Sequence, residues 1–204
     1  MFITLEGPEG SGKTSQVPLL AEFLRQQGRE VITTREPGGT AIGDQIRTVL
    51  TTLGNTAMQP RTEILLFLAA RAQLVQQLIQ PALAEGKTVL CDRYGDSTLA
   101  YQGYGHELDL EQLRMLLRFA TGGLEPDLTL LLDIDVEAGL RRKLYSGSEW
   151  NRLDAYAVAF HQRVRQGYQA LVKDEPQRWV VIDASQPPEM VQLALRRAVA
   201  ERVK

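Results

Sequence analysis

The sequence predicts an α/β fold in which helices cover both faces of a five-stranded parallel sheet. Short apolar runs rich in Val, Ile, Leu and Thr recur along the chain. Most are separated by segments whose apolar residues return every three or four positions, as in helices. Strands that alternate with helices pair in parallel and are buried on both faces. The five apolar runs are residues 2–5, 31–34, 88–91, 128–132 and 179–182.

The bulk composition indicates one globular unit. The chain has 204 residues, of which 44% are hydrophobic and 24% charged, and its formal net charge is -2. Because no shift in composition divides it, we expect a single domain spanning residues 1–204. This charge balance gives no sign of a general nucleic-acid or membrane surface.

Cysteine usage and hydropathy predict a cytoplasmic protein. The single cysteine, Cys91, excludes an internal disulfide and fits a reducing compartment. No apolar run approaches the length of a membrane span, and the N-terminus has the pattern of a strand rather than of a signal peptide.

The first strand leads directly into a phosphate-binding loop. Residues 7–14 match the pattern G-x-x-x-x-G-K-[ST] and precede a helical pattern. Glycines let backbone N–H groups converge on phosphate oxygens, and the helix N-terminus favours the negative charge. Lys13 is suited to reach the β- and γ-phosphates of ATP, and Thr14 to ligate Mg²⁺. The predicted nucleotide site comprises Gly7, Pro8, Glu9, Gly10, Ser11, Gly12, Lys13 and Thr14.

The second strand and the helix after it predict a nucleobase pocket. An irregular segment, residues 34–43, follows this strand at the sheet edge where open α/β folds bind ligands. The long helical pattern of residues 63–84 places Phe67 and Arg71 four residues apart on one face. A ring that stacks on a base, with Arg71 and the amide of Gln102 to read its edge, describes such a pocket. The spacing of Phe67 and Arg71 by itself fits a core phenylalanine beside a helix-surface arginine better, so the pocket depends on the whole set of residues.

The third strand ends in Asp92 followed by Arg93. A motor ATPase usually has Asp-Glu at this point, where Glu activates water, and a GTP switch carries Asn-Lys-x-Asp; neither is present. An arginine directly after the acid indicates a second anion, which favours phosphoryl transfer between two phosphorylated molecules. Asp92 could hold Mg²⁺, directly or through water, or it could orient Arg93 by an ion pair; we favour the metal.

The segment after the fourth strand has the composition of a flexible cover for the site. The fourth strand ends at Asp133, which we interpret as a structural acid near the nucleotide. Basic residues then flank the Ser/Gly-containing stretch 145–151, a composition consistent with a flexible cover at approximately residues 141–153. These basic residues are Arg141, Arg142, Lys143 and Arg152.

Taken together, these segments resemble the bacterial thymidylate kinases. The stretches EGPEGSGKT, TREPGGT, FLAAR, DRYGDSTLAYQG, PDLTLLLD and NRLD occur in the family's order and span nearly the whole chain. The resemblance implies a P-loop fold of the nucleoside monophosphate kinase type and transfer of the γ-phosphoryl group of MgATP to dTMP. It also implies a homodimer formed through helices, with dTMP and ATP as small-molecule partners and with no nucleic acid or membrane partner.

The resemblance also implies roles for residues in the acceptor site. Phe67 would stack on thymine and Arg71 would hydrogen-bond its carbonyl edge. Glu9 would accept a hydrogen bond from the 3′-hydroxyl of the deoxyribose, and Arg93 would face the dTMP phosphate or the transferring group. The further substrate-binding residues expected are Arg35, Glu36, Arg47, Ser97, Tyr101 and Gln102.

The resemblance places the catalytic arginine in the lid. Gly10 stands where other family members carry an arginine, so the charge must come from elsewhere. Arg152 matches the family's lid arginine best, and Arg142 is second. The expected catalytic residues are therefore Lys13, Arg93, Arg152 and Arg142, and Ser185 is expected in the loop on the adenine side.

Two other functions stay open from the sequence. A deoxynucleoside kinase attacks with a neutral hydroxyl and needs a carboxylate base, for which Glu36 is available; another P-loop nucleoside monophosphate kinase is the closely related case. A non-catalytic switch would bind ATP without transferring phosphate, but the arginines of the second site argue against it.

Overall fold

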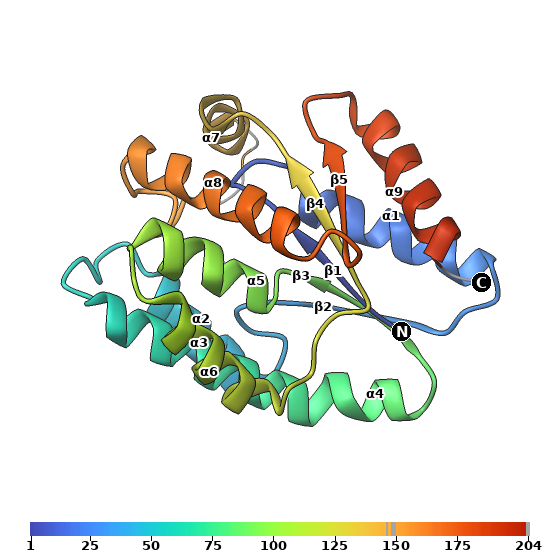
Figure 1. The fold of residues 1–204 in the computed structure, drawn as a ribbon, viewed down its shortest axis with the longest axis horizontal. Helices are drawn as coiled ribbons and strands as arrows, with labels where there is room; N and C mark the ends of the chain where they lie inside the picture. Colours follow the sequence, from blue (N-terminus) through green and yellow to red (C-terminus); the bar gives the residue numbers. More distant parts are fainter. Residues whose placement is uncertain (146, 148–149, 203–204) are drawn as a thin grey trace.

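The computed structural model describes residues 1–145, 147 and 150–202, and within them five strands form one parallel sheet in the order β2-β3-β1-β4-β5 (Figure 1). The predicted fold class is confirmed, and each strand extends one residue beyond its predicted carboxyl end. The strands are β1 (Phe2–Glu6), β2 (Val31–Arg35), β3 (Thr88–Asp92), β4 (Leu128–Asp133) and β5 (Trp179–Asp183).

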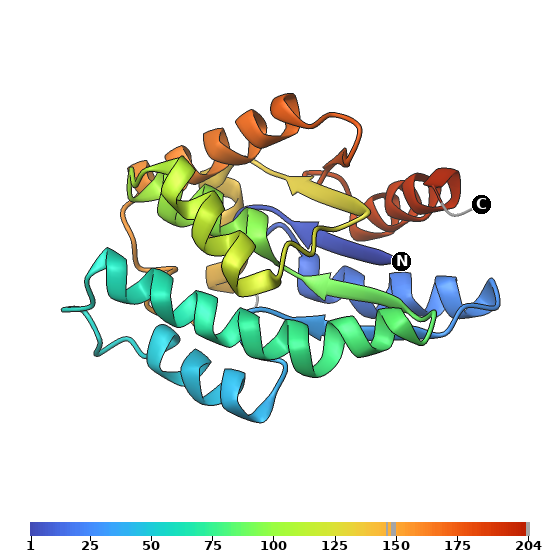
Figure 2. The ribbon, with the colours of Figure 1, turned by 60° about the horizontal axis from the view of Figure 1, so that its bottom comes forward.

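Helices lie on both sides of this sheet (Figures 1 and 2). On one side, α1 (Lys13–Gln26) and α9 (Pro188–Arg202) bury strand residues such as Ile3, Leu130 and Ile182. Alternate strand residues, such as Leu131 and Trp179, face the other side, where they pack with residues of several helices. The helices of that side are α3 (Pro60–Leu74), α4 (Gln80–Ala84), α5 (Gly95–Thr98), α6 (Leu110–Thr121) and α8 (Val158–Asp174).

The predicted helical segment 63–84 is confirmed, but it is not uniformly α-helical. Its middle, η1 (Val75–Ile79), is a π-helical turn between α3 and α4. Pro81 lies in the first turn of α4 and has no N–H for the hydrogen bond to the preceding turn. The π-helical turn lies directly before this break, and single π-helical turns inside longer helices are the usual form of the π-helix. A second π-helical turn, η2 (Leu99–Gly105), follows α5 directly.

The carboxyl ends of the strands meet at one edge of the sheet and position the loops that follow. Glu6 pairs in register with Leu131, and Arg35 with Asp92. Gly7, the first loop residue, packs so closely on β4 that a Cβ there would overlap the carbonyl oxygen of Leu132. The remaining helices, α2 (Ala41–Thr51) and α7 (Val136–Tyr145), begin at this same edge.

In residues 1–145, 147 and 150–202, no helix combines the length and the apolar character that crossing a bilayer requires.

Candidate active site

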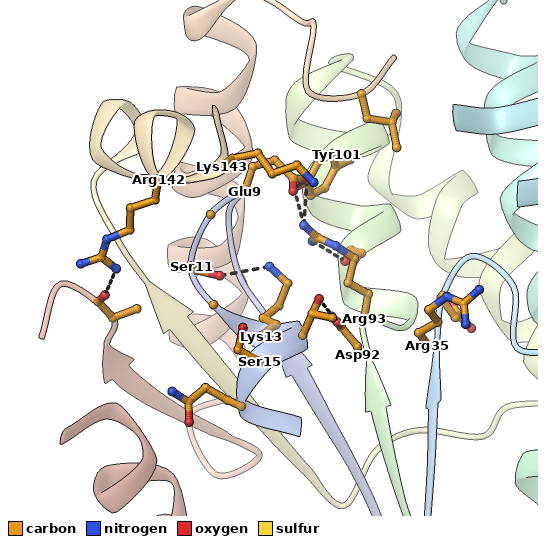
Figure 3. Close-up of a pocket in the computed structure, with 18 of the residues that line it drawn as sticks. Glu9, Ser11, Lys13, Ser15, Arg35, Asp92, Arg93, Tyr101, Arg142 and Lys143 are labelled. Atoms are coloured by element: carbon orange, nitrogen blue, oxygen red, sulfur yellow. Dashed lines mark hydrogen bonds and ion pairs between the residues drawn. The ribbon is translucent and has the colours of Figure 1, made fainter. Parts of the chain in front are cut away.

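A cavity of about 1210 Å³ runs along the carboxyl edge of the sheet (Figure 3). Its lining includes the phosphate loop, the segments after β2 and β3, the helix α3 and the loop after β5. The sequence predicted a nucleotide site and a base pocket separately, and the fold joins both in one cavity. Among the predicted site residues it is lined by Glu9, Gly10, Ser11, Gly12, Lys13, Thr14, Arg35, Glu36, Arg47, Phe67, Arg71, Asp92, Arg93, Ser97, Tyr101, Gln102, Arg142 and Ser185.

The phosphate loop holds the ammonium group of Lys13 by three hydrogen bonds. Lys13 Nζ donates hydrogen bonds to the carbonyl oxygens of Gly7 and Pro8, each at 2.9 Å, and to the hydroxyl of Ser11 at 3.0 Å. Gly12, which caps α1, has a φ of 93°, a left-handed conformation that glycine adopts readily. Burial, followed by the charge of Arg93, lowers the pKa of Lys13 to about 8. A buried cation beside a helix N-terminus is suited to bind a polyphosphate.

The two residues predicted to hold Mg²⁺ are in direct contact. Thr14 Oγ1 donates to Asp92 Oδ2 at 2.7 Å across the gap between α1 and β3. A hydroxyl and a carboxylate beside a phosphate loop are oxygen ligands of the kind Mg²⁺ prefers, with phosphates and water completing its shell. No group of three or more His, Cys, Asp or Glu side chains that could hold a metal occurs in the described part of the chain. The hydroxyl of Thr14 and the carboxylate of Asp92 therefore fit two positions in the oxygen shell of a Mg²⁺ ion.

Arg93 lies at the centre of the site. Its φ of 70° is unusual for a residue with a side chain, and such strain is typical of functional positions. Its Nη2 donates to Glu9 Oε1 at 2.8 Å, and its Nη1 donates to the carbonyl oxygen of Gly7 at 3.0 Å. The ion pair that the sequence left open between Asp92 and Arg93 is not formed in the described residues, because Glu9 takes that place.

Glu9 is held by Arg93 and Tyr101 (Figure 3). The hydroxyl of Tyr101 donates to Glu9 Oε1 at 2.7 Å. Burial alone would raise the pKa of this carboxyl, but the charges of Arg93 and Lys13 and the Tyr101 hydrogen bond bring it down to about 2. Glu9 is therefore ionised at neutral pH and faces the segment after β3 rather than the backbone amides of its own loop.

The predicted base-pocket residues Phe67 and Arg71 both line the cavity from α3. Arg71 is buried and uses four of its five N–H groups on Glu36, on the Thr98 hydroxyl and on the carbonyl oxygen of Tyr94. The second N–H of Nη1 has no partner in the described residues. This guanidinium is therefore rigid and has one donor left for a ligand.

Only one of the two carboxylate oxygens of Glu36 has a hydrogen-bond partner within the described residues. Its Oε2 accepts both Arg71 bonds, and its Oε1 is buried without a hydrogen-bond partner in the described residues. Burial raises the pKa of this carboxyl, opposed by the charge of Arg71. The side chain lines the cavity and has one acceptor available.

The other residues that the sequence predicts for the binding of the phosphoryl acceptor line this part of the cavity. Arg35 pairs with Asp44 at 3.2 Å, and Arg47 Nη1 donates to the Pro37 carbonyl oxygen at 2.9 Å. Ser97 Oγ donates to Glu6 at 2.6 Å, which ties the loop after β3 to the end of β1. Two arginines next to each other are suited to an anionic group such as a phosphate monoester.

The structure separates the basic residues predicted for the lid. Arg142 lies against the loop after β5, where it donates to the carbonyl oxygens of Ala184 and Ser185 at 2.6 and 3.0 Å. Lys143 lies beside Glu9 in Figure 3, and its charge contributes to the low pKa of that carboxyl. Residues 146, 148 and 149 of the predicted lid lie outside the described residues.

Arg152 is not where the sequence led us to expect it. It does not line the cavity, and its side chain is only 6% exposed. Its guanidinium donates to Glu63 at 2.6 Å, to the Tyr156 hydroxyl at 2.7 Å and to the Leu50 carbonyl oxygen at 2.8 Å. A phosphate contact by Arg152 would leave Glu63 as an unpaired buried charge, which is strongly unfavourable. The expectation that Arg152 is the catalytic arginine is therefore corrected.

The structure gives contacts in or beside the site to three residues that no sequence pattern singled out. Lys143 was counted among the lid cations, but no pattern singled it out. Thr98, which fixes Arg71, lies in the stretch after β3 that already contained Ser97 and Tyr101. Glu63 carried no signal beyond the start of a helical pattern, because its partners are distant in the chain.

Comparison with known proteins points to one family over nearly the whole chain. The family model described as thymidylate kinase matches residues 5–194. A protein of that name from Roseiflexus castenholzii is 54% identical over 201 residues, which covers 93% of this chain and 88% of the relative. Another of that name, from Thermomicrobium roseum, is 54% identical over 203 residues, covering 100% and 96%. A crystal structure of thymidylate kinase from Ehrlichia chaffeensis matches with a TM-score of 0.81 and 33% identity, covering 98% of each chain.

Proposed function

The chain belongs to the thymidylate kinase family, and from that membership we propose how its residues divide the work of the reaction. The activity is transfer of a phosphoryl group from ATP to dTMP, giving dTDP and ADP. One observation carries the assignment of residues. A single cavity holds the phosphate loop at one end and the pocket of Phe67 and Arg71 at the other, with Glu9 and Arg93 between them.

The phosphate loop is the site for the ATP phosphates. Lys13 would exchange its contacts with loop carbonyls for contacts with the phosphates, which are better partners for an ammonium group. Thr14 and Asp92 would hold Mg²⁺, which neutralises charge on the transferring group when it is bound. Ser185, together with the loop after β5 that Arg142 fixes, would lie at the adenine.

The pocket beside α3 is the site for dTMP. Phe67 would stack on the base, and the remaining N–H of Arg71 would donate to a base carbonyl. Glu9 would accept a hydrogen bond from the sugar hydroxyl. The monophosphate would lie against the cluster formed by Arg35, Arg47 and Arg93.

The site would promote the reaction by aligning the two nucleotides and by neutralising the charge on the transferring phosphoryl group. A phosphate monoester is already ionised at neutral pH, so dTMP attacks without a general base. Lys13 and Arg93 both donate to the carbonyl oxygen of Gly7, so the two cations lie close together and would share the charge that develops between the two nucleotides. Arg142 and Lys143 of α7 would help to cover the phosphates and exclude water.

We also propose that residues 1–204 form one kinase domain, with residues 141–153 as its lid, which acts as a homodimer in the cytoplasm. Exposed apolar side chains support the dimer, because Met115 is 68% exposed and Phe119 is 89% exposed on α6. The buried free Cys91 is consistent with a reducing compartment.

A nucleotide panel tests the function, with ADP release as the measurement. We expect dTMP to be the preferred acceptor among dTMP, dUMP, dCMP, AMP and thymidine. Lys13→Ala and Arg93→Ala should each lower turnover at least about 100-fold, because each removes a charge from the transferring group. Lys173→Ala, at the exposed end of α8, is the matched control and should leave turnover unchanged.

The panel also separates the alternatives. Phosphorylation of thymidine with refusal of dTMP would identify a deoxynucleoside kinase. Turnover close to wild type in folded Lys13→Ala or Arg93→Ala would contradict the roles proposed for these two residues.

A further inference from the structure

Glu63 is a buried acid on α3 that the reaction described above does not use. Its side chain is 1% exposed, and it does not line the cavity. Four side chains nevertheless bond to it, from η2, from the residue after η2 and from the segment between α7 and α8. It therefore connects the predicted lid segment to the base pocket.

The two carboxylate oxygens of Glu63 have separate partners. Oε1 accepts from Gln102 Nε2 at 2.7 Å and contacts His106 Nε2 at 3.2 Å. Oε2 accepts from Arg152 Nη2 at 2.6 Å and from the Tyr156 hydroxyl at 2.8 Å. Although burial acts to raise the pKa of Glu63, these hydrogen bonds and the charge of Arg152 bring it down to about 2. At neutral pH the carboxylate can only accept hydrogen bonds.

This arrangement determines which way the amide of Gln102 points. Gln102 must turn its NH₂ group toward Glu63, because the reversed amide would bring two acceptor oxygens together. Gln102 is 2% exposed and lines the cavity, and no hydrogen bond within the described residues uses its Oε1. The amide therefore offers the cavity an acceptor and not a donor.

We propose that Glu63, held by Arg152, is a positioning residue that orients the Gln102 amide and thereby selects bases that carry a ring N–H. The proposal rests on the proposed function, in which this pocket takes the base of dTMP. Thymine presents an N–H donor at N3 beside a carbonyl acceptor at C4, whereas cytosine presents an acceptor beside an amino donor. The acceptor of Gln102 and the donor of Arg71 match thymine and oppose cytosine.

The substitution Glu63→Gln should reverse the amide of Gln102. The introduced amide has one oxygen, and Arg152, which can only donate, requires an acceptor on its side. The introduced NH₂ group then faces Gln102, whose own amide must turn its oxygen toward it. The cavity then receives a donor at this one position where it had an acceptor, and a donor matches N3 of cytosine but opposes the N3–H of thymine.

The experiment compares dTMP with 5-methyl-dCMP, which has the same shape and differs only in the hydrogen-bonding edge of the base. The ratio of the two kcat/KM values is measured in the wild type and in Glu63→Gln. We expect the preference for dTMP to fall at least about tenfold, chiefly through a higher KM for dTMP. Because Arg71 is present in both proteins, its contribution to the preference for dTMP cancels when the two kcat/KM ratios are compared.

Two variants act as controls. Tyr156→Phe removes one bond to Oε2 and leaves Oε1 and Gln102 in place, so the ratio should not change. Gln102→Leu removes the amide and should reduce the ratio, and adding Glu63→Gln to it should then have no further effect. If Glu63→Gln does not fold, the pair Glu63→Leu with Arg152→Leu replaces the ion pair by apolar side chains and should also lower the ratio.

The outcomes separate this proposal from the proposed function. A wild type that does not phosphorylate dTMP contradicts the function itself. A wild type that does so, with an unchanged ratio in the folded Glu63 variants or in Gln102→Leu, overturns the role of Glu63 alone.

Discussion

Glu9 is an anion in a loop that otherwise presents groups for binding anions, and its partners explain its presence. The carboxylate is bound by Arg93 and Tyr101, both from the segment after β3. Lys13 and the loop glycines remain for the nucleotide phosphates. In the proposed function the loop therefore takes part in two sites, with Glu9 turned toward the site proposed for dTMP.

Glu9→Gln tests this division. We expect a KM for dTMP that rises several times more than the KM for ATP, because the amide is a weaker partner for Arg93 and for the sugar hydroxyl. Steady-state kinetics with each substrate varied in turn is the measurement. A rise in the KM for ATP alone would contradict the assignment.

Glu9→Gln should also change how the unfolding free energy depends on pH in the acid range. The pKa of Glu9 is lowered from 4.5 to about 2 in the folded protein, and at about 1.4 kcal/mol per pH unit this corresponds to about 3 kcal/mol. The stabilisation is present above pH 4.5 and is lost as the pH falls toward 2. The difference in unfolding free energy between wild type and Glu9→Gln should therefore shrink across this range, as measured by denaturant titration. A difference that stays constant would contradict the low pKa.

At the scale of elements, the phosphate loop and α7 pack backbone to backbone. A Cβ at Gly10 would overlap the carbonyl oxygen of Gly139, and a Cβ at Gly139 would overlap that of Glu9. The left-handed φ of 69° at Gly10 also disfavours any side chain. An arginine could not replace Gly10 without displacing α7, so the loop itself cannot supply a cation at this position, and Arg142 and Lys143 of α7 line the cavity beside it.

Gly139→Ala tests this contact. Alanine raises the helix propensity of α7 by about 1 kcal/mol, yet its methyl group must push the phosphate loop away. We expect the KM for ATP to rise about tenfold or more, because the loop donors are displaced from the phosphates. Gly54→Ala is the matched control, since a Cβ there meets no atom within 4 Å. Wild-type kinetics in Gly139→Ala would show that the loop tolerates the displacement.

At the scale of the whole molecule, exposed apolar side chains lie on two helices that contact each other. Met115 and Phe119 are on α6, and Leu65, which is 59% exposed, is on α3. Figure 2 shows these helices on the side of the sheet that faces away from α1 and α9. Such a face is the natural candidate for the interface of the proposed homodimer.

Phe119→Glu tests that interface. A charge in the centre of an apolar contact is costly to bury, so the variant should sediment as a monomer at concentrations where the wild type is a dimer. Met190→Glu, on the exposed side of α9, should keep the wild-type mass. If Phe119→Glu also keeps the mass of the dimer, the interface lies elsewhere.

Much of the molecule could be predicted from the sequence, because the signals are local. Strands of five or six residues show their apolar runs directly, and the phosphate loop is one contiguous motif that includes Lys13 and Thr14. The order of strands and helices then brings Asp92 and Arg93 to the same edge of the sheet. These residues line the cavity as the sequence predicted.

Tertiary structure alone decided the contacts between residues that are distant in the chain. Arg152 looks like a lid cation in the sequence, but Glu63 lies 89 positions away and binds it in the interior. The close approach of Gly10 and Gly139 likewise depends on how α7 packs on the loop. Sequence patterns report which face of an element is buried, whereas the partner of a buried charge is set by the packing of elements far apart in the chain. For this reason the phosphate site was determined by the sequence itself, and the orientation of the base pocket only by the fold.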